Sequence, residues 1–118
     1  MTVPQEVAAI AWRSPWTPVA SPRFEARLAK EAGPGHVLSG RPVIAVGRRM
    51  DSDDVLFFLP GGPAMLAVVH LTWSTRTPEA DPRFPHTDLY QSVAQWIEKR
   101  MIPDGNEFLE GAGPVELR

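Results

Sequence analysis

The chain has 118 residues, including 13 prolines and no cysteine, and a net charge of −2. This length suits one domain with one core, and the missing cysteines exclude a disulfide framework, thiolate zinc sites and cysteine nucleophiles. The mixed charges form no basic face for phosphate groups, so we expect no nucleic-acid partner.

The apolar stretches predict neither export nor membrane insertion. Residues 7–12 are shorter than the apolar core of a signal peptide, and no run approaches the ~20 apolar residues that span a bilayer. Together with the lack of cysteine, this predicts a cytoplasmic protein without a membrane partner. Arginine outnumbers lysine and proline is abundant, a bias typical of GC-rich bacterial genomes, which favours a bacterial source.

Residues 1–20 form an irregular segment rich in tryptophan and proline. Its prolines exclude a long helix, because proline lacks an N–H donor and clashes with the preceding turn. Residues 7–12 could form one helical turn or a short strand. We expect Trp12 and Trp16 to lie across the core; the alternative is an exposed tail that inserts its aromatic rings into a partner.

A helix is predicted over residues 22–32. Ser21 suits the N-cap, and the proline after it suits the first helical position, where its missing donor is not needed. Phe24 and Leu28 lie four residues apart on one face. The glycines and proline of residues 33–35 end the helix.

Three strand-like runs follow, at residues 42–49, 55–59 and 64–73. The connections, residues 51–54 and 60–63, have the length and composition of hairpin turns. An antiparallel meander is therefore the simplest topology, to which the N-terminal segment could add a fourth strand.

Consecutive apolar residues indicate that both faces of this sheet are buried. Side chains alternate along a strand, so Phe57 and Phe58 point to opposite faces, as do Val68 and Val69. A meander with one face in water would alternate apolar and polar residues. The helices can cover one face. The N-terminal segment or a second copy of the chain could cover the other.

Residues 74–86 predict a proline-rich loop, followed by a second helix over 87–101. Thr87 suits its N-cap, and Asp88 in the first turn suits the helix dipole. An apolar stripe repeats at helical spacing: Leu89, Val93, Trp96, Ile97 and Met101. Residues 102–105 are expected to end this helix, and residues 106–118 to form a loosely ordered tail.

These elements predict a single α+β domain over residues 1–118. Its expected architecture is a three- to four-stranded antiparallel meander packed by the two helices. No internal repeat interrupts this organisation.

The known metal and cofactor motifs are missing. Counted from the acidic run at residues 51–54, an EF-hand would need glycine and glutamate where the chain has Leu56 and Gly62. The run is therefore interpreted as a solvated hairpin turn. The histidines lack the spacing of metal ligands, and no nucleotide-binding glycine pattern or serine-nucleophile elbow occurs. We predict no metal, no cofactor and no complete catalytic set.

Polar residues gather where the third strand ends. His70 and Thr72 lie two residues apart on one face, and Trp73 opens the loop. The imidazole could act as a base or ligand contact, the indole could wall a pocket, and the fold could bring His86 and Asp88 to the same place. These five residues are the candidate ligand-binding residues. The alternative is structural, with His70 tying the sheet to the loop and Trp73 closing one end of the core.

The string from Ala67 to Ser74, Ala-Val-Val-His-Leu-Thr-Trp-Ser, resembles a segment of small bacterial proteins to which we attach no activity. In those proteins an apolar strand ends in His-Leu-Thr-Trp and is followed by a loop with glutamate, proline and an aromatic residue, then a helix. The resemblance covers roughly residues 36–105. It implies that the His-Leu-Thr-Trp strand end is the functional position of the group.

Two classes of function remain open. The first is a non-catalytic interaction or binding protein, such as a homodimer or an immunity-type protein that inhibits a partner. The second apolar sheet face and the missing catalytic set support it. The second class is a small ligand-binding or hydrolytic domain with its site at His70, Thr72 and Trp73, because loops at strand ends commonly carry sites. We favour the first class and expect a homodimer or another protein partner.

Overall fold

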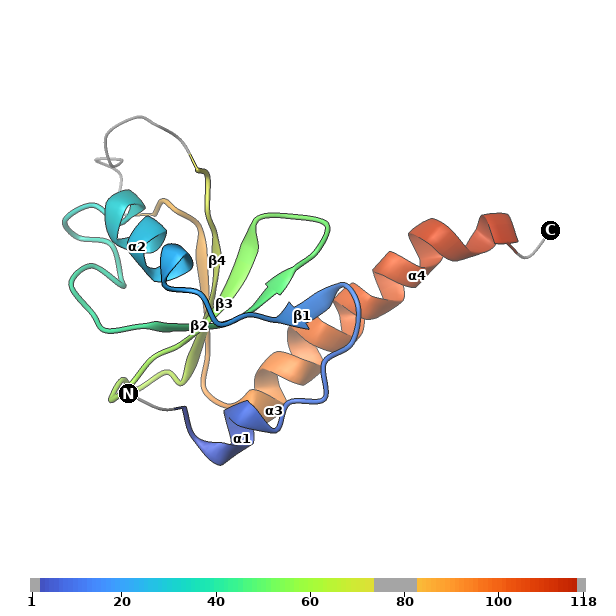
Figure 1. Ribbon diagram of the computed structural model, residues 1–118, viewed down its shortest axis with the longest axis horizontal. Coiled ribbons are helices and arrows are strands. Elements are labelled where there is room, and N and C mark those ends of the chain that lie inside the picture. The colour runs from blue at the N-terminus through green and yellow to red at the C-terminus, as the bar shows by residue number, and fades with distance from the viewer. Residues whose placement is uncertain (1–2, 74–82, 117–118) are drawn as a thin grey trace.

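The computed structural model describes residues 3–73 and 83–116, with side chains described as far as Leu109. Its elements, in chain order, are α1 (Gln5–Ala8), β1 (Trp16–Pro18), α2 (Pro22–Glu31), β2 (Ile44–Arg49), β3 (Asp54–Phe58), β4 (Leu66–His70), β5 (Thr87–Tyr90), α3 (Val93–Trp96), the π-helical turn η1 (Ile97–Met101) and α4 (Ile102–Glu116). The strands form one antiparallel sheet in the order β1-β2-β3-β4-β5 (Figure 1).

The structure confirms an α+β fold with an antiparallel meander, and it extends the sheet to five strands. The N-terminal segment supplies β1, in which Trp16 pairs with Arg49. The predicted helix α2 is present, and the Ser21 side chain accepts a hydrogen bond from the backbone N–H of Arg23. Local capping therefore determines where this helix begins.

The predicted helix over 87–101 is wrong in its first part. Residues 87–90 form the strand β5, and the helix begins only after Ser92, whose side chain caps it by accepting from the backbone of Gln95. Asp88 is thus a strand residue and not part of a helical first turn. Pairing with β4 outweighs the helical spacing of Leu89 with the residues after it.

The predicted helix end at residues 102–105 is also wrong, because α4 continues to Glu116. Pro103 is the second residue of α4, which begins at the end of the π-helical turn η1. A π-helical turn bonds residues five apart, so the donor that Pro103 lacks falls where the ordinary ladder is already interrupted. The end of α4 points away from the sheet (Figure 1). No described helix is long and apolar enough to cross a bilayer.

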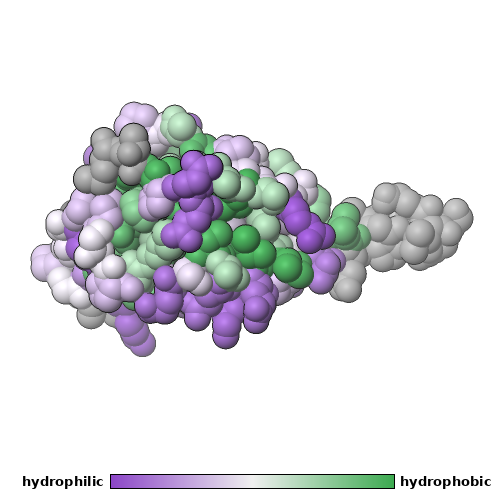
Figure 2. All heavy atoms as spheres, turned by 90° about the horizontal axis from the view of Figure 1, so that it is seen from below, coloured by the Kyte–Doolittle hydropathy of each residue, from purple (hydrophilic) through white to green (hydrophobic). Residues whose placement is uncertain are grey.

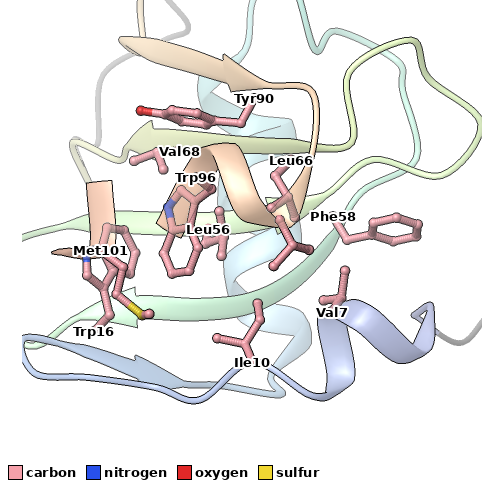
Figure 3. Packing of buried hydrophobic residues seen from close by; sticks show 11 residues of the cluster. Val7, Ile10, Trp16, Leu56, Phe58, Leu66, Val68, Tyr90, Trp96 and Met101 are labelled. Atoms are coloured by element: carbon pink, nitrogen blue, oxygen red, sulfur yellow. The ribbon is translucent and has the colours of Figure 1, made fainter. Parts of the chain in front are cut away.

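One face of the sheet is covered by the N-terminal segment together with α3 and η1 (Figure 3). Trp16 and Trp96 meet edge to face with ring centroids 5.3 Å apart, and Trp12 also meets Trp96 edge to face at 5.8 Å. The N-terminal tryptophans therefore lie across the core, as expected. Viewed from the α1 side, hydrophobic residues lie on both sides of a hydrophilic group in the middle of the surface, and further hydrophilic residues line one border (Figure 2).

The opposite face of the sheet is covered by α2 and the loop after it. Phe24 and Leu28 of α2 are buried with Phe57 and Val69 from the sheet. Both faces are apolar, as the sequence predicts, and elements of this chain cover both. The apolar sheet faces therefore no longer give a reason to expect a second copy of the chain over one of them.

Gly47 in β2 lies against the Trp12 ring, and a methyl group added there would overlap that ring. Such overpacking is expected to make Gly47→Ala less stable by about 1–3 kcal/mol, measured by urea unfolding. Gly62→Ala is the control, because its methyl group would chiefly meet the flexible end of Arg41. Equal losses in the two variants would contradict close packing of Trp12 on β2.

Candidate functional site

A hollow of about 440 Å³ lies over the ends of β3, β4 and β5, and we name it the His–Asp pocket. Its lining is polar apart from one valine and consists of Asp54, Val68, His70, His86, Asp88 and Arg100. The strand register explains the gathering, because Asp54 pairs with His70 and Val68 pairs with Asp88. Paired residues point to the same face of a sheet.

His70 is held by the carboxylate beside it on β3. Its Nδ1 lies 2.8 Å from Asp54 Oδ1. A carboxylate accepts hydrogen bonds, so Nδ1 carries the proton and Nε2 of the neutral ring keeps a free lone pair. The side chain is 54% exposed, so this lone pair belongs to an imidazole that solvent can reach.

His86 faces a carboxylate with its other ring nitrogen. Its Nε2 lies 3.3 Å from Asp88 Oδ1, and both side chains are well exposed. This is an ion-pair distance between an exposed imidazole and an exposed carboxylate. The two imidazoles lie beside different carboxylates, one on β3 and one on β5.

Arg100 closes the pocket from η1, and neighbouring groups already engage its donors. Its Nη2 lies 3.1 Å from Asp54 Oδ2, and its Nε lies 3.1 Å from Asp104 Oδ2. Its Nη1 lies 3.8 Å from Asp88 Oδ2. Burial acts to lower the pKa of Arg100, but the hydrogen bond to Tyr90 and the charge of Asp104 outweigh it and raise the pKa. The guanidinium is thus a fixed structural cation.

Asp104 joins this network to the core. It accepts from the indole N–H of Trp16 at 2.9 Å, and Arg49 Nη1 lies 3.3 Å from the same carboxylate. Arg49 also holds Asp51 through two contacts of 2.8 Å. The hydrogen bond to Arg49 lowers the pKa of Asp51. A series of ion pairs therefore connects Arg100 of the His–Asp pocket through Asp104 to Arg49.

The structure brings together three of the candidate residues, His70, His86 and Asp88, and separates Thr72 and Trp73 from them. Strand β4 ends at His70, and Trp73 has a positive φ of 55°. The chain thereby leaves the strand alternation that would place Thr72 beside His70. Neither Thr72 nor Trp73 lines the pocket.

Glu31 at the end of α2 holds the departing chain instead. Its carboxylate accepts from the backbone N–H groups of Thr72 and Trp73, each at 2.8 Å. The Trp73 ring lies under the guanidinium of Arg23, 5.0 Å from its centroid. These contacts are those of a structural anchor between α2 and the end of β4.

Sequence reasoning missed two pocket residues. Asp54 belongs to the acidic run interpreted as a solvated turn, but it is the first residue of β3. Arg100 was not singled out from the sequence, although its spacing of four from Asp104 was an available signal.

The third histidine, His36, is buried and structural. Its Nδ1 accepts from the backbone of Leu38 at 3.0 Å, so its Nε2 donates to the carbonyl oxygen of Pro85 at 2.9 Å. Within the described part of the chain, no cluster of three or more His, Asp or Glu residues is placed to hold a metal ion.

Comparison with family models, curated proteins and solved structures finds no match for this chain. The resemblance of residues 67–74 to small bacterial proteins stays a prediction. The function is therefore inferred from the chemistry of the His–Asp pocket.

Proposed function

We propose that the protein is a non-catalytic binding domain whose His–Asp pocket holds a cationic nitrogen group, an amine or a guanidinium, of its ligand. The observation that carries this proposal is that the open polar atoms of the pocket are acceptors. They are Nε2 of His70 and the exposed carboxylate of Asp88. Arg100 directs its donors to aspartates of the protein itself.

Charge supports the same ligand class. With neutral imidazoles, two carboxylates face one guanidinium in the lining, so the pocket carries an excess of negative charge. Its volume of about 440 Å³ falls in the range of roughly 300–1,000 Å³ typical of small-ligand sites. An amino-acid-sized amine or guanidinium, free or as a side chain of a partner protein, matches both the charge and the size.

A binding role is favoured over catalysis by the nature of the lining. The described lining residues include no serine, threonine or cysteine, and the hydroxyl of Thr72 is hydrogen-bonded to Glu31. The expected cytoplasmic location and bacterial source remain part of this proposal, supported by the composition of the chain.

A hydrolytic domain is the second candidate function, and the contact between Asp54 and His70 favours it. A carboxylate on Nδ1 leaves Nε2 able to take a proton from water. Hydrolysis of activated ester substrates that disappears in His70→Ala would support this alternative over simple binding.

The binding proposal is tested by titrating the protein with methylguanidinium, putrescine, acetate and phosphate, followed by NMR. We expect the two cations to bind and the two anions not to bind. Asp88→Asn should weaken cation binding about tenfold, the effect of losing one hydrogen bond to a charged group. Asp53→Asn is the matched control, since Asp53 is exposed and does not line the pocket.

His70→Ala should also weaken cation binding. The melting temperature should stay nearly unchanged, because His70 is exposed and the ion pair between Asp54 and Arg100 remains in the variant. Anions binding as well as cations, or equal effects of Asp88→Asn and Asp53→Asn, would contradict the proposal. Short peptides containing arginine distinguish a free small cation from a side chain of a partner protein. If the natural ligand is a protein side chain, the peptides should bind more tightly than methylguanidinium.

A further inference from the structure

Strand β5 is the last strand of the sheet and pairs with β4 alone (Figure 3). His70 N–H donates to the carbonyl of His86, just before β5, so within β5 the residues that bond β4 are Asp88 and Tyr90. The backbone N–H and C=O groups of Thr87 and Leu89 therefore point outward from the sheet. No described residue pairs with them.

The opposite margin of the sheet is protected. Strand β1 has three residues, contains Pro18 and follows Pro15. Proline lacks a donor, and such residues block pairing at sheet edges. Residues 87–90 contain neither proline nor lysine, so β5 is the margin that can accept another strand.

Exposed apolar side chains accompany this open edge. Leu89 in β5 is 41% exposed, and Phe84, just before the strand, is 46% exposed. Val37 is 47% exposed and follows His36, whose ring contacts the Thr87 hydroxyl at 3.2 Å. The open backbone edge thus lies among apolar side chains that a partner strand would cover.

We propose that two copies of the chain pair their β5 strands antiparallel, around a two-fold axis at Leu89, and join the two sheets into one. The occupant is a second copy because one antiparallel register of β5 with itself satisfies both the backbone and the side chains. In that register Leu89 bonds the partner subunit's Leu89 in both directions. Asp88 then lies opposite the partner subunit's Tyr90.

The neighbouring registers are unfavourable. An axis at Asp88 would place two aspartates directly opposite each other, and like charges in that position repel. An axis at Thr87 would place Leu89 against the partner subunit's Pro85, which has no N–H to donate. Its carbonyl already accepts from His36 and Thr87. Of the axes at Thr87, Asp88 and Leu89, only the axis at Leu89 avoids both conflicts. An axis at Tyr90 would place Leu89 against the partner subunit's Gln91, whose backbone N–H already donates to Gln95 Oε1.

The dimer is tested by sedimentation velocity of the full chain at micromolar concentrations. The expected result is a dimer for the natural chain and at least a tenfold higher dissociation constant for Leu89→Lys, which sets two like charges at the axis. Met50→Lys is the matched control, because Met50 is 53% exposed but lies after β2, away from β5. A monomeric natural chain, or a Leu89→Lys dimer as tight as the control, would overturn the proposal.

The register is tested separately with single-cysteine variants, for which the cysteine-free chain is suited. Hydrogen-bonded residue pairs have Cα atoms about 5.5 Å apart, within reach of a disulfide. Leu89→Cys should therefore oxidise to a covalent dimer faster than Met50→Cys, and equal rates would refute the axis at Leu89. Leu89 points to the sheet face opposite the His–Asp pocket, so Leu89→Lys should still bind methylguanidinium if the proposed function holds.

Discussion

Replacing Trp16 by alanine is expected to lower the free energy of unfolding by about 3–5 kcal/mol, the range for deleting a buried aromatic side chain. Trp16 is 2% exposed, packs on Trp96 and donates to Asp104. The variant therefore loses core packing and a link between β1 and α4 together. Urea unfolding followed by circular dichroism measures the loss.

A matched pair of variants separates the hydrogen bond of Trp16 from its packing. The indole N–H of Trp96 is buried and has no hydrogen-bond partner among the described residues, whereas that of Trp16 donates to Asp104 at 2.9 Å. Trp16→Phe should therefore cost about 1–2 kcal/mol more than Trp96→Phe. If Trp96→Phe proves as costly as Trp16→Phe, the contact with Asp104 contributes nothing to stability.

Glu31→Gln is expected to lower the free energy of unfolding by about 2–3 kcal/mol, because a neutral amide replaces a buried acceptor of several donors. Glu31 is 6% exposed and accepts from Arg27 Nε at 2.6 Å, as well as from the backbones of Thr72 and Trp73. An amide oxygen cannot serve all of them, and its NH₂ group would face a donor. Thermal and urea unfolding at pH 7 measure the effect.

The contribution of Glu31 should depend on pH. Burial acts to raise its pKa, but the hydrogen bonds from Thr72, Arg27 and Trp73 outweigh burial, so the pKa lies below its ordinary value of 4.5. A group with a lowered folded-state pKa stabilises the protein above its unfolded-state pKa, and this stabilisation is lost as the pH falls through the folded-state pKa. The free energy of unfolding of the natural chain should therefore exceed that of Glu31→Gln most at pH 7. This difference in stability should shrink below pH 4.5.

Glu98→Gln serves as the control for this pH dependence, since Glu98 is an exposed residue of η1. It should change stability little at either pH. A constant difference between the natural chain and Glu31→Gln from neutral to acidic pH would show that the charge of Glu31 is not what stabilises the end of β4.

Local chemistry predicted much of the fold. Helix α2 begins directly after Ser21 because this cap and the following proline act within one turn. The two buried sheet faces followed from consecutive apolar residues such as Phe57 and Phe58, and both are buried. Strand β5 was missed, because Leu89 fits the apolar spacing of the following helix but lies exposed in the strand. Pairing with β4 depends on residues distant in sequence, and no local pattern reports it.

The sequence by itself determined which short stretches carry polar groups, including His70, His86 and Asp88, and that the sheet is buried on both sides. Only the tertiary structure decided that Asp54 and Arg100 complete the pocket while Thr72 is drawn away to Glu31. The reason is the distance along the chain. Asp54 bonds His70 across 16 positions and Arg100 across 46. Contacts of that separation come from strand register and helix packing and not from neighbouring residues.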